Sequence, residues 1–215
     1  MSVDLVVTFI PIFISVVLHE VAHGCAALGF GDDTAKRYGR LSLNPIDHVD
    51  FVGTLLLPLV LWWGKAPFLF GWAKPVPVNF ERLRNKKIGT VVVASAGIAV
   101  NAVLAIGAAM VIDNIDLGVY SEMFFTNLLL INLVLIFLNI LPFPPLDGSK
   151  IFFGWMESDW AKKYVRAERN GLIVLVLLVA VVPLIGVLLG IKEIKIFNPL
   201  EWYMQAMFDW VMRVL

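Results

Sequence analysis

Four apolar runs, each about 20 residues long or somewhat longer, constrain the fold of this chain more than any other feature. They cover residues 4–29, 88–112, 123–141 and 172–191. Because the core of a bilayer offers the backbone no hydrogen-bond partners, a run that crosses it must be a helix or part of a closed barrel. The chain is 60% hydrophobic and only 16% charged, which is more apolar than a soluble domain. We therefore predict an all-α membrane protein with about four transmembrane helices.

Three further segments are predicted to associate with the membrane or with the helices without crossing. Residues 51–72 begin with an apolar stretch that is short for a span, so we interpret them as a membrane-inserted hairpin. The two prolines within residues 73–78 predict extended chain and a short β segment. The tail, residues 198–215, mixes aromatic and charged side chains and is predicted to form an interfacial amphipathic helix.

We expect one domain over residues 1–215. Its parts are a core at 4–155, an additional transmembrane helix at 172–191 and an amphipathic tail at 198–215. The single cysteine, Cys25, excludes an internal disulfide. The formal net charge of zero gives no reason to expect a nucleic-acid partner. The start of the chain lacks the basic region and cleavage site of a signal peptide, so we expect the first run to remain as a helix.

The placement of lysine and arginine predicts the orientation in the membrane. The segments 32–50, 64–87 and 142–171 hold 14 of the 17 basic residues, and residues 113–122 hold none. All three basic segments lie on the cytosolic side only if residues 51–72 enter and leave the membrane on that side. If residues 51–72 cross, the basic segments fall on opposite sides and the rule fails. We expect a multi-pass protein of the cell membrane.

The first apolar run contains an H-E-x-x-H motif, formed by His19, Glu20 and His23. On a helix, residues four apart face the same side, so both imidazoles can bind one zinc ion while the glutamate acts on a water bound to the metal. Ionisable groups within a span are costly and usually functional. The alternative is a pair of histidines that bond to neighbouring helices and bind no metal. The orientation places the motif toward the cytosolic side.

A catalytic zinc site needs a third protein ligand and one open position for water. His48 is the only other histidine, and Asp147 follows a proline-rich stretch just past the third run, on the side where the motif lies. An unpaired carboxylate at the membrane boundary is costly, and metal coordination would offset that cost. We favour Asp147, for which a turn or capping role is the alternative. For His48 we expect a hydrogen bond that orders its loop.

Three motifs follow each other along the chain: His19-Glu20-Val21-Ala22-His23, Gly97-Ile98-Ala99-Val100-Asn101 and Asn139-x-x-Pro142-x-Pro144-Pro145-Leu146-Asp147-Gly148. Their order and spacing resemble those of the site-2 protease family of intramembrane zinc metalloproteases. The likeness covers roughly residues 10–155, and residues 44–50 and 70–79 look like the compact prokaryotic branch of the family, so we expect a member with no PDZ or nucleotide-sensing domain.

The resemblance implies one zinc ion per chain, held by His19, His23 and Asp147, with water in the fourth position. Glu20 is then the general base that takes a proton from this water and returns one to the leaving amine. Asn101 is expected to contact the substrate or to stabilise the developing oxyanion. A hydrogen bond between membrane helices is the alternative role for Asn101.

A transmembrane substrate must unwind before its peptide carbonyls can be attacked, because a helix uses them in its own hydrogen bonds. An exposed strand edge could hold the unwound segment by strand addition. Our candidate for this edge lies within residues 64–80 and includes Val76 and Val78. For Asn132 and Asn139 we expect only hydrogen bonds between helices.

We therefore predict an intramembrane zinc metalloprotease that hydrolyses peptide bonds within or near transmembrane segments. The alternative is a membrane metal transporter or a catalytically silent metal-binding scaffold. Glu20 distinguishes the two, because an acid beside the first histidine suits water activation and is not needed for transport. The expected partners are transmembrane protein or peptide substrates and the lipid bilayer, and assembly with a second copy of the chain is left open.

Overall fold

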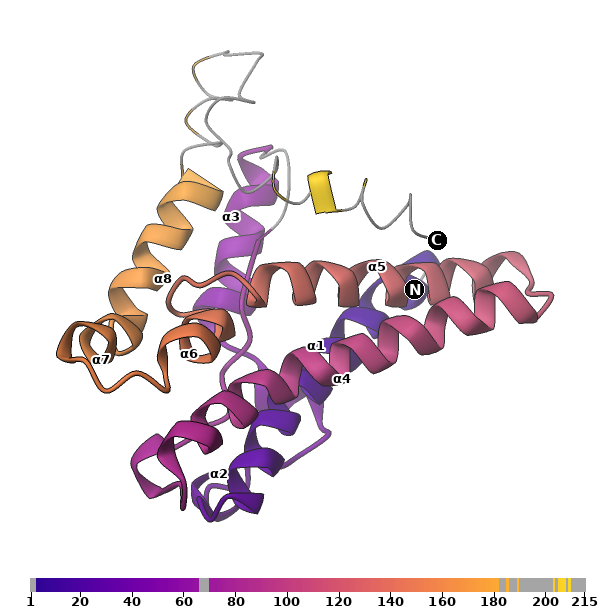
Figure 1. Ribbon diagram of the computed structural model, residues 1–215. Helices are drawn as coiled ribbons and strands as arrows, with labels where there is room; N and C mark the ends of the chain where they lie inside the picture. Colours follow the sequence, from indigo (N-terminus) through magenta and orange to yellow (C-terminus); the bar gives the residue numbers. More distant parts are fainter. Residues whose placement is uncertain are drawn as a thin grey trace. The chain divides into compact units, whose positions relative to one another are not determined.

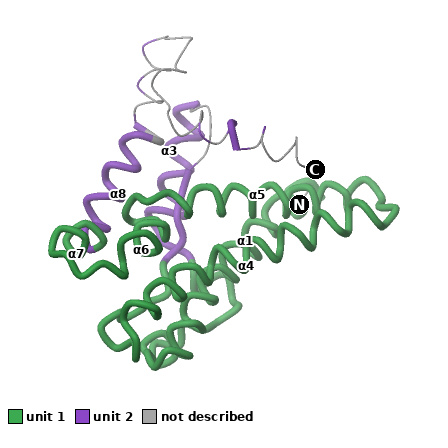
Figure 2. Tube along the Cα trace, viewed as in Figure 1, with its two compact units in different colours: residues 1–48, 75–165 green, residues 49–74, 166–215 purple. Residues whose placement is uncertain are grey.

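The computed structural model describes residues 3–65 and 70–181, together with residues 185, 189, 203, 205–207 and 209. Its regular secondary structure in these residues is entirely helical. Figure 2 shows two compact units, one made of residues 1–48 and 75–165 and the other of residues 49–74 and 166–215. The expectation of one domain over residues 1–215 stays a prediction.

Three long helices form the body of the first unit (Figure 1): α1 (Val3–Gly29), α4 (Lys86–Asn114) and α5 (Val119–Asn139). Each of them packs against the other two. All three are long and apolar enough to cross a membrane. The structure thus confirms that the chain is largely helical and that its first, second and third apolar runs have the length and composition of spans.

Small residues let α4 approach its neighbours closely. The face of α4 that is buried carries Gly89, Ala94, Gly97, Ala105 and Ala108. In a membrane, where lipid tails are as apolar as leucine, helices associate through such close contacts and through hydrogen bonds rather than by burying apolar surface. The close approach on this face is what brings side chains of α1 and α4 into direct contact at the site described below.

The carboxylate of Asp32 holds the segment that precedes α4 against the end of α1. Asp32 is fully buried. It accepts hydrogen bonds from the backbone N–H of Thr34 (3.1 Å), from the Thr34 hydroxyl and from the backbone N–H of Asn79 (2.6 Å). The N–H of Arg84 donates to the carbonyl of Phe30 at 2.8 Å. Residues 75–84 are therefore attached to the first helix before α4 begins.

Charged side chains around the short helix α2 (Thr34–Arg37) face solvent. Arg37 donates two hydrogen bonds to the Asp33 carboxylate, at 2.6 and 2.7 Å, and these lower the pKa of Asp33 below its usual value. Arg82 lies in the helical turn η3 (Phe80–Arg82), and its Nη1 is 2.9 Å from Asp33 Oδ1. Its positive charge lowers the pKa of Asp33 further. These pairs are exposed, so they add little to stability.

His48 ends the short helical turn η1 (Pro45–His48), and a hydrogen bond that orders this loop is predicted for it. His48 is buried, and its Nε2 lies 2.8 Å from the carbonyl oxygen of Ser42. This is the loop-ordering hydrogen bond expected for His48, and the residue is not part of the histidine cluster described below.

After α5 the chain turns sharply into α6 (Asp147–Phe153), which packs on α4, and then into α7 (Asp159–Val165). A Cβ at Gly148 would overlap the backbone carbonyl oxygens of Ile140 and Leu141, so only glycine allows this close turn. Tyr164 donates a hydrogen bond to the carbonyl of Pro142 at 2.8 Å. The turn places Asp147 at the first position of α6.

The second unit contains the π-helical turn η2 (Phe51–Leu56), α3 (Leu57–Trp63), α8 (Glu168–Val176) and η4 (Leu177–Val181). Residues 51–63 form a continuous apolar helical segment, shorter than a span. Its start is paired with Trp72: the Trp72 N–H donates to the Gly53 carbonyl (3.2 Å), and Thr54 donates to the Trp72 carbonyl (2.9 Å). The two ends of the predicted hairpin therefore meet, while its insertion in a membrane stays a prediction.

Two predicted features are not found as expected. No strand forms in the described residues, so the predicted short β segment at 73–78 is not present there. The physical reason is that Pro75 and Pro77 have no N–H to donate, and the N–H of Val76 donates to the carboxylate of Glu20 instead of to a neighbouring strand. Directly after the segment, the N–H of Asn79 donates to Asp32. Of the predicted fourth span, residues 182–191 lie almost wholly outside the described residues, as does most of the tail at 198–215. The number of four spans stays a prediction.

Candidate metal centre

Helix α1 presents His19 and His23 on one face, one turn apart, and α6 brings Asp147 against them. The two Nε2 atoms are 3.0 Å apart, and each lies 3.3 Å from Asp147 Oδ2. His19 is 7% exposed. One ligand atom from each of the three residues lies within 4.8 Å of the others, a spacing that can hold a metal ion. The structure thus brings together the three residues that sequence reasoning had proposed as ligands.

The hydrogen bonds on the far side of the rings fix which nitrogen carries the proton. His19 Nδ1 lies 2.5 Å from Asn101 Oδ1, and His23 Nδ1 lies 2.7 Å from the carbonyl oxygen of Val93. Carbonyl oxygens only accept, so each Nδ1 must be the donor. In a neutral imidazole each Nε2 then keeps its lone pair, and each Nε2 lies 3.3 Å from Asp147 Oδ2. Metal-bound histidines are typically held in this way.

This donor set fits a zinc ion. When both imidazoles are neutral with the proton on Nδ1, the contacts of 3.3 Å to Asp147 Oδ2 are not hydrogen bonds, because none of the three atoms has a proton to share. Asp147 Oδ2 is buried and has no hydrogen-bond partner. Three lone-pair atoms that converge away from water need a cation between them. Two imidazoles and one carboxylate are ligands that zinc accepts in catalytic sites.

One stripe of α4 faces both histidines. Val93, Gly97 and Asn101 follow each other at intervals of four residues, so they lie one above the other on the helix. Val93 supplies a carbonyl to His23, and Asn101 supplies an amide oxygen to His19. A Cβ on Gly97 would lie 2.5 Å from His19 Cε1 and 2.6 Å from His23 Nε2. Glycine is therefore required for the two rings to lie this close to α4.

Asn101 is fully buried and bridges three helices. Its Oδ1 faces His19 on α1, and its Nδ2 donates to Asn132 Oδ1 on α5 at 2.7 Å. The hydrogen bond between helices that was considered as the alternative is thus present. Contact with a substrate or an oxyanion stays a prediction for this residue.

Glu20 is connected to the segment that contains both predicted substrate-contacting valines. The backbone N–H of Val76 donates to Glu20 Oε2 at 2.8 Å. Val76 is buried, and its side chain lies against Gly24, one turn beyond Glu20 on α1. Val78 packs against the apolar cluster that includes Ala27. The segment therefore lies along the α1 face that follows the motif, and the Val76 N–H is already bonded.

Sequence reasoning missed three contributors to this site. The Val93 carbonyl belongs to the backbone, so no side chain signals it. Asn132 was expected to bridge helices only, yet it bonds to the residue that orients His19. Ser15 accepts a hydrogen bond from Asn132 at 2.8 Å. It precedes His19 by four residues, and this spacing on α1 is the signal that could have revealed its contribution.

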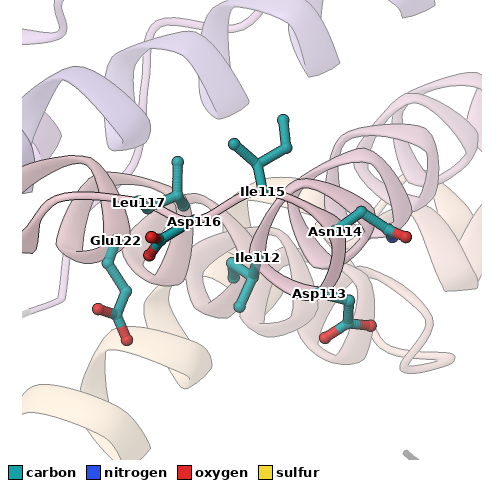
Figure 3. Close-up of a pocket in the computed structure, with 7 residues that line it drawn as sticks. All are labelled: Ile112, Asp113, Asn114, Ile115, Asp116, Leu117 and Glu122. Atoms are coloured by element: carbon teal, nitrogen blue, oxygen red, sulfur yellow. The ribbon is translucent and has the colours of Figure 1, made fainter.

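The turn between α4 and α5 forms an open pocket of about 410 Å³ (Figure 3). Its polar lining includes three carboxylates, Asp113, Asp116 and Glu122. It begins about three helical turns along α4 from Asn101 and is not part of the histidine cluster. Exposed acidic groups are common without a bound ion, and nothing in the described residues indicates a ligand for this pocket.

The fold and the site together define a class of protein: a helical protein with helices long and apolar enough to span a membrane, which carries a histidine and aspartate cluster on an H-E-x-x-H motif that could hold a metal ion. Comparison with known proteins agrees. The model of peptidase family M50 matches residues 113–184. YwhC of Bacillus subtilis (strain 168), named as a zinc metalloprotease, is 39% identical over 178 residues, which are 79% of this chain and 78% of the relative.

A second relative, Rip2 of Mycolicibacterium smegmatis (strain ATCC 700084 / mc(2)155), is also named as a zinc metalloprotease. It is 30% identical over 169 residues, which are 76% of this chain and 62% of the relative. No solved structure matches the chain. The chain belongs to peptidase family M50, the site-2 protease family. It is a metalloprotease, and zinc is its cofactor.

Proposed function

We propose that this chain is an intramembrane protease that hydrolyses peptide bonds within or near transmembrane segments of membrane proteins. The observation that carries the proposal is the convergence of His19 Nε2, His23 Nε2 and Asp147 Oδ2 within a bundle of membrane-length helices. These three residues would hold one zinc ion per chain. When bound, the zinc supplies a Lewis acid and lowers the pKa of a coordinated water toward neutrality.

Glu20 is the proposed general base. It lies next to His19 on α1, and the hydrogen bond from the Val76 N–H to its Oε2 fixes the orientation of the carboxylate. Its other oxygen can accept a proton from the attacking water and later deliver it to the leaving amine. Asn101 is the proposed contact for the substrate carbonyl, through the N–H of its amide that does not bond to Asn132.

The site is proposed to open to the cytosolic side of the cell membrane. The support is the charge distribution, because the segments 32–50, 64–87 and 142–171 hold most of the basic residues. Asp147 lies inside the segment 142–171, just past the end of the third apolar run. Water and the cleaved product would then exchange through the polar segments on that side.

The extended segment at residues 73–79 is proposed to hold the unwound substrate. Replacing Val78 with proline removes a backbone N–H that could pair with the substrate. We expect cleavage of a helical single-span substrate to fall by about five- to tenfold, the worth of one hydrogen bond, while the zinc content stays unchanged. The Val78→Ala variant is the control, because it loses the packing against the apolar cluster near Ala27 but keeps the N–H. Equal cleavage by the two variants would rule out pairing at this position.

Removal of the metal tests the proposed function directly. The purified full-length chain in detergent is expected to cleave a single-span substrate, to lose this activity on treatment with a zinc chelator and to regain it when one equivalent of zinc is restored. Zinc flux through vesicles that contain the chain is measured in parallel. Flux without cleavage would show that the chain is a transporter, whereas bound zinc with neither flux nor cleavage would show a silent scaffold. Within the part of the chain that the structure describes, one cluster of side chains that could hold a metal ion is found, and the lack of a second one there supports the protease over the transporter.

A further inference from the structure

Three buried polar side chains lie behind His19, on the side away from the proposed metal. Ser15, Asn101 and Asn132 come from α1, α4 and α5, and all three are 0% exposed. Burying such groups is costly unless their hydrogen bonds are satisfied. The proposed reaction needs two histidines, two carboxylates and at most one of these three residues. The hydrogen bonds that connect these residues to His19 indicate the role of the other two.

The orientation of the Asn132 amide is fixed by its surroundings. Its Nδ2 lies 2.7 Å from the carbonyl oxygen of Leu128 and 2.8 Å from Ser15 Oγ. The carbonyl can only accept, so the amide nitrogen must face it. The Ser15 hydroxyl donates to the carbonyl of Pro11 at 2.7 Å, which leaves the Ser15 oxygen to accept from Asn132. The amide oxygen of Asn132 is consequently directed toward α4.

The fixed oxygen of Asn132 in turn orients the next amide. Asn132 Oδ1 accepts from Asn101 Nδ2 at 2.7 Å, so Asn101 must present its own Oδ1 to His19 Nδ1. His19 is then protonated on Nδ1, and its Nε2 keeps a free lone pair. If the Asn101 amide were reversed, its NH₂ group would face Nδ1, the proton would move to Nε2, and that nitrogen could not bind a metal.

We propose that Asn132, supported by Ser15, is a positioning residue that sets the tautomer of His19 through Asn101. The proposal rests on the proposed function only in taking His19 as a metal ligand. It assigns to Asn132 a role beyond the bridging of helices. His23 needs no such series of hydrogen bonds, because its Nδ1 bonds directly to the backbone carbonyl of Val93, which cannot reverse.

The test compares the zinc affinity of two leucine variants on the same helix. Asn132→Leu removes the acceptor that orients Asn101. Asn127→Leu is the matched control, because Asn127 also bridges α5 to α1, with its Nδ2 donating to the Val7 carbonyl at 3.1 Å, but it has no link to His19. Zinc affinity is measured by chelator competition on the purified full-length chain, without substrate. We expect a loss of about 10- to 100-fold for Asn132→Leu, the usual effect of removing an outer partner of a metal ligand. We expect little change for Asn127→Leu.

A second variant restores the orientation by another route. In Asn101→Asp both oxygens of the ionised carboxylate are acceptors, so His19 Nδ1 has an acceptor whichever way the carboxylate turns. The double variant Asn101→Asp/Asn132→Leu should therefore recover zinc affinity relative to Asn132→Leu alone. The absorption bands of the cobalt-substituted protein should shift in the single variant and return in the double variant.

Two results would overturn the proposal: equal zinc affinity in Asn132→Leu and Asn127→Leu, or no recovery in the double variant. A wild-type chain that binds zinc without cleaving any substrate would contradict the proposed function, but the affinity comparison would still decide the role of Asn132. A wild-type chain that binds no zinc would remove the basis of both.

Discussion

The Glu20→Gln variant is expected to hydrolyse peptide bonds about 10²–10⁴-fold more slowly than the wild-type chain, the usual contribution of a general base, while one zinc ion stays bound. Glutamine has nearly the same shape, and its amide oxygen can still accept the hydrogen bond that Val76 donates to Glu20. It cannot take a proton from water. The metal ligands and the extended segment should therefore keep their positions, and only proton transfer should be lost.

Cleavage rate and bound zinc are measured on the same purified samples. Asp32→Asn is the control, because Asp32 is the other carboxylate that holds the extended segment, through the N–H of Asn79. It is not adjacent to either histidine in sequence. Loss of its charge should lower stability and leave the cleavage rate close to that of the wild type. If Glu20→Gln retains more than about a tenth of the wild-type rate, the residue is not the general base.

The convergence of His19, His23 and Asp147 was predictable from sequence, because each of these proposed ligands leaves a signal that depends only on local structure. The spacing of four between His19 and His23 fixes their common face on any helix. Asp147 is indicated by the prolines that end the third run just before it, on the side of the membrane where the predicted orientation places the motif. Both arguments need the number and direction of the helices and no detail of their packing.

The network around the ligands was not predictable in the same way. The carbonyl of Val93 is a backbone group, and any residue at that position could supply it. The hydrogen bonds that connect Leu128, Asn132 and Asn101 depend on which helices are in contact and at which level along their axes. An asparagine within an apolar run indicates a buried hydrogen bond, but the sequence does not name its partner.

The predicted β segment shows a second limit of sequence reasoning. Prolines and alternating valines correctly indicate chain that is not helical at residues 73–78. A strand also needs a partner for its N–H groups, and no local pattern supplies one. In the structure, the N–H of Val76 finds a carboxylate on α1. Substrate pairing along this segment would therefore have to use other N–H groups or displace Glu20 from Val76.

Replacing Gly97 with alanine is expected to weaken zinc binding by about 10- to 100-fold, in the range observed when groups around a metal ligand are altered, and to lower cleavage with it. The added Cβ would lie 2.5 Å from an atom of the His19 ring and 2.6 Å from an atom of the His23 ring. Real Cβ atoms do not approach other atoms so closely. Either the rings or the helices must move.

Neither movement preserves the site. The Nδ1 atoms of both histidines are bonded to α4 itself, through Val93 and Asn101, so moving α4 away from α1 lengthens the hydrogen bonds that fix the tautomers. Rotating the rings instead turns the two Nε2 atoms away from Asp147. The cost of such overpacking is about 1–3 kcal/mol, and here it is concentrated on the ligands.

Gly107→Ala provides the matched control, because Gly107 lies on the same helix and no atom lies within 4 Å of an added Cβ. Zinc affinity and thermal stability are measured for both variants. Gly107→Ala should bind zinc like the wild type. If Gly97→Ala does the same, the two rings do not rest on α4 when the metal is bound, and glycine at this position serves the packing of the helices and not the metal centre. A loss of zinc affinity in Gly97→Ala but not in Gly107→Ala would show that two successive turns of α4 both serve the metal centre. Gly97 leaves space for the two imidazole rings, and Asn101, four residues later, supplies the hydrogen-bond acceptor for His19.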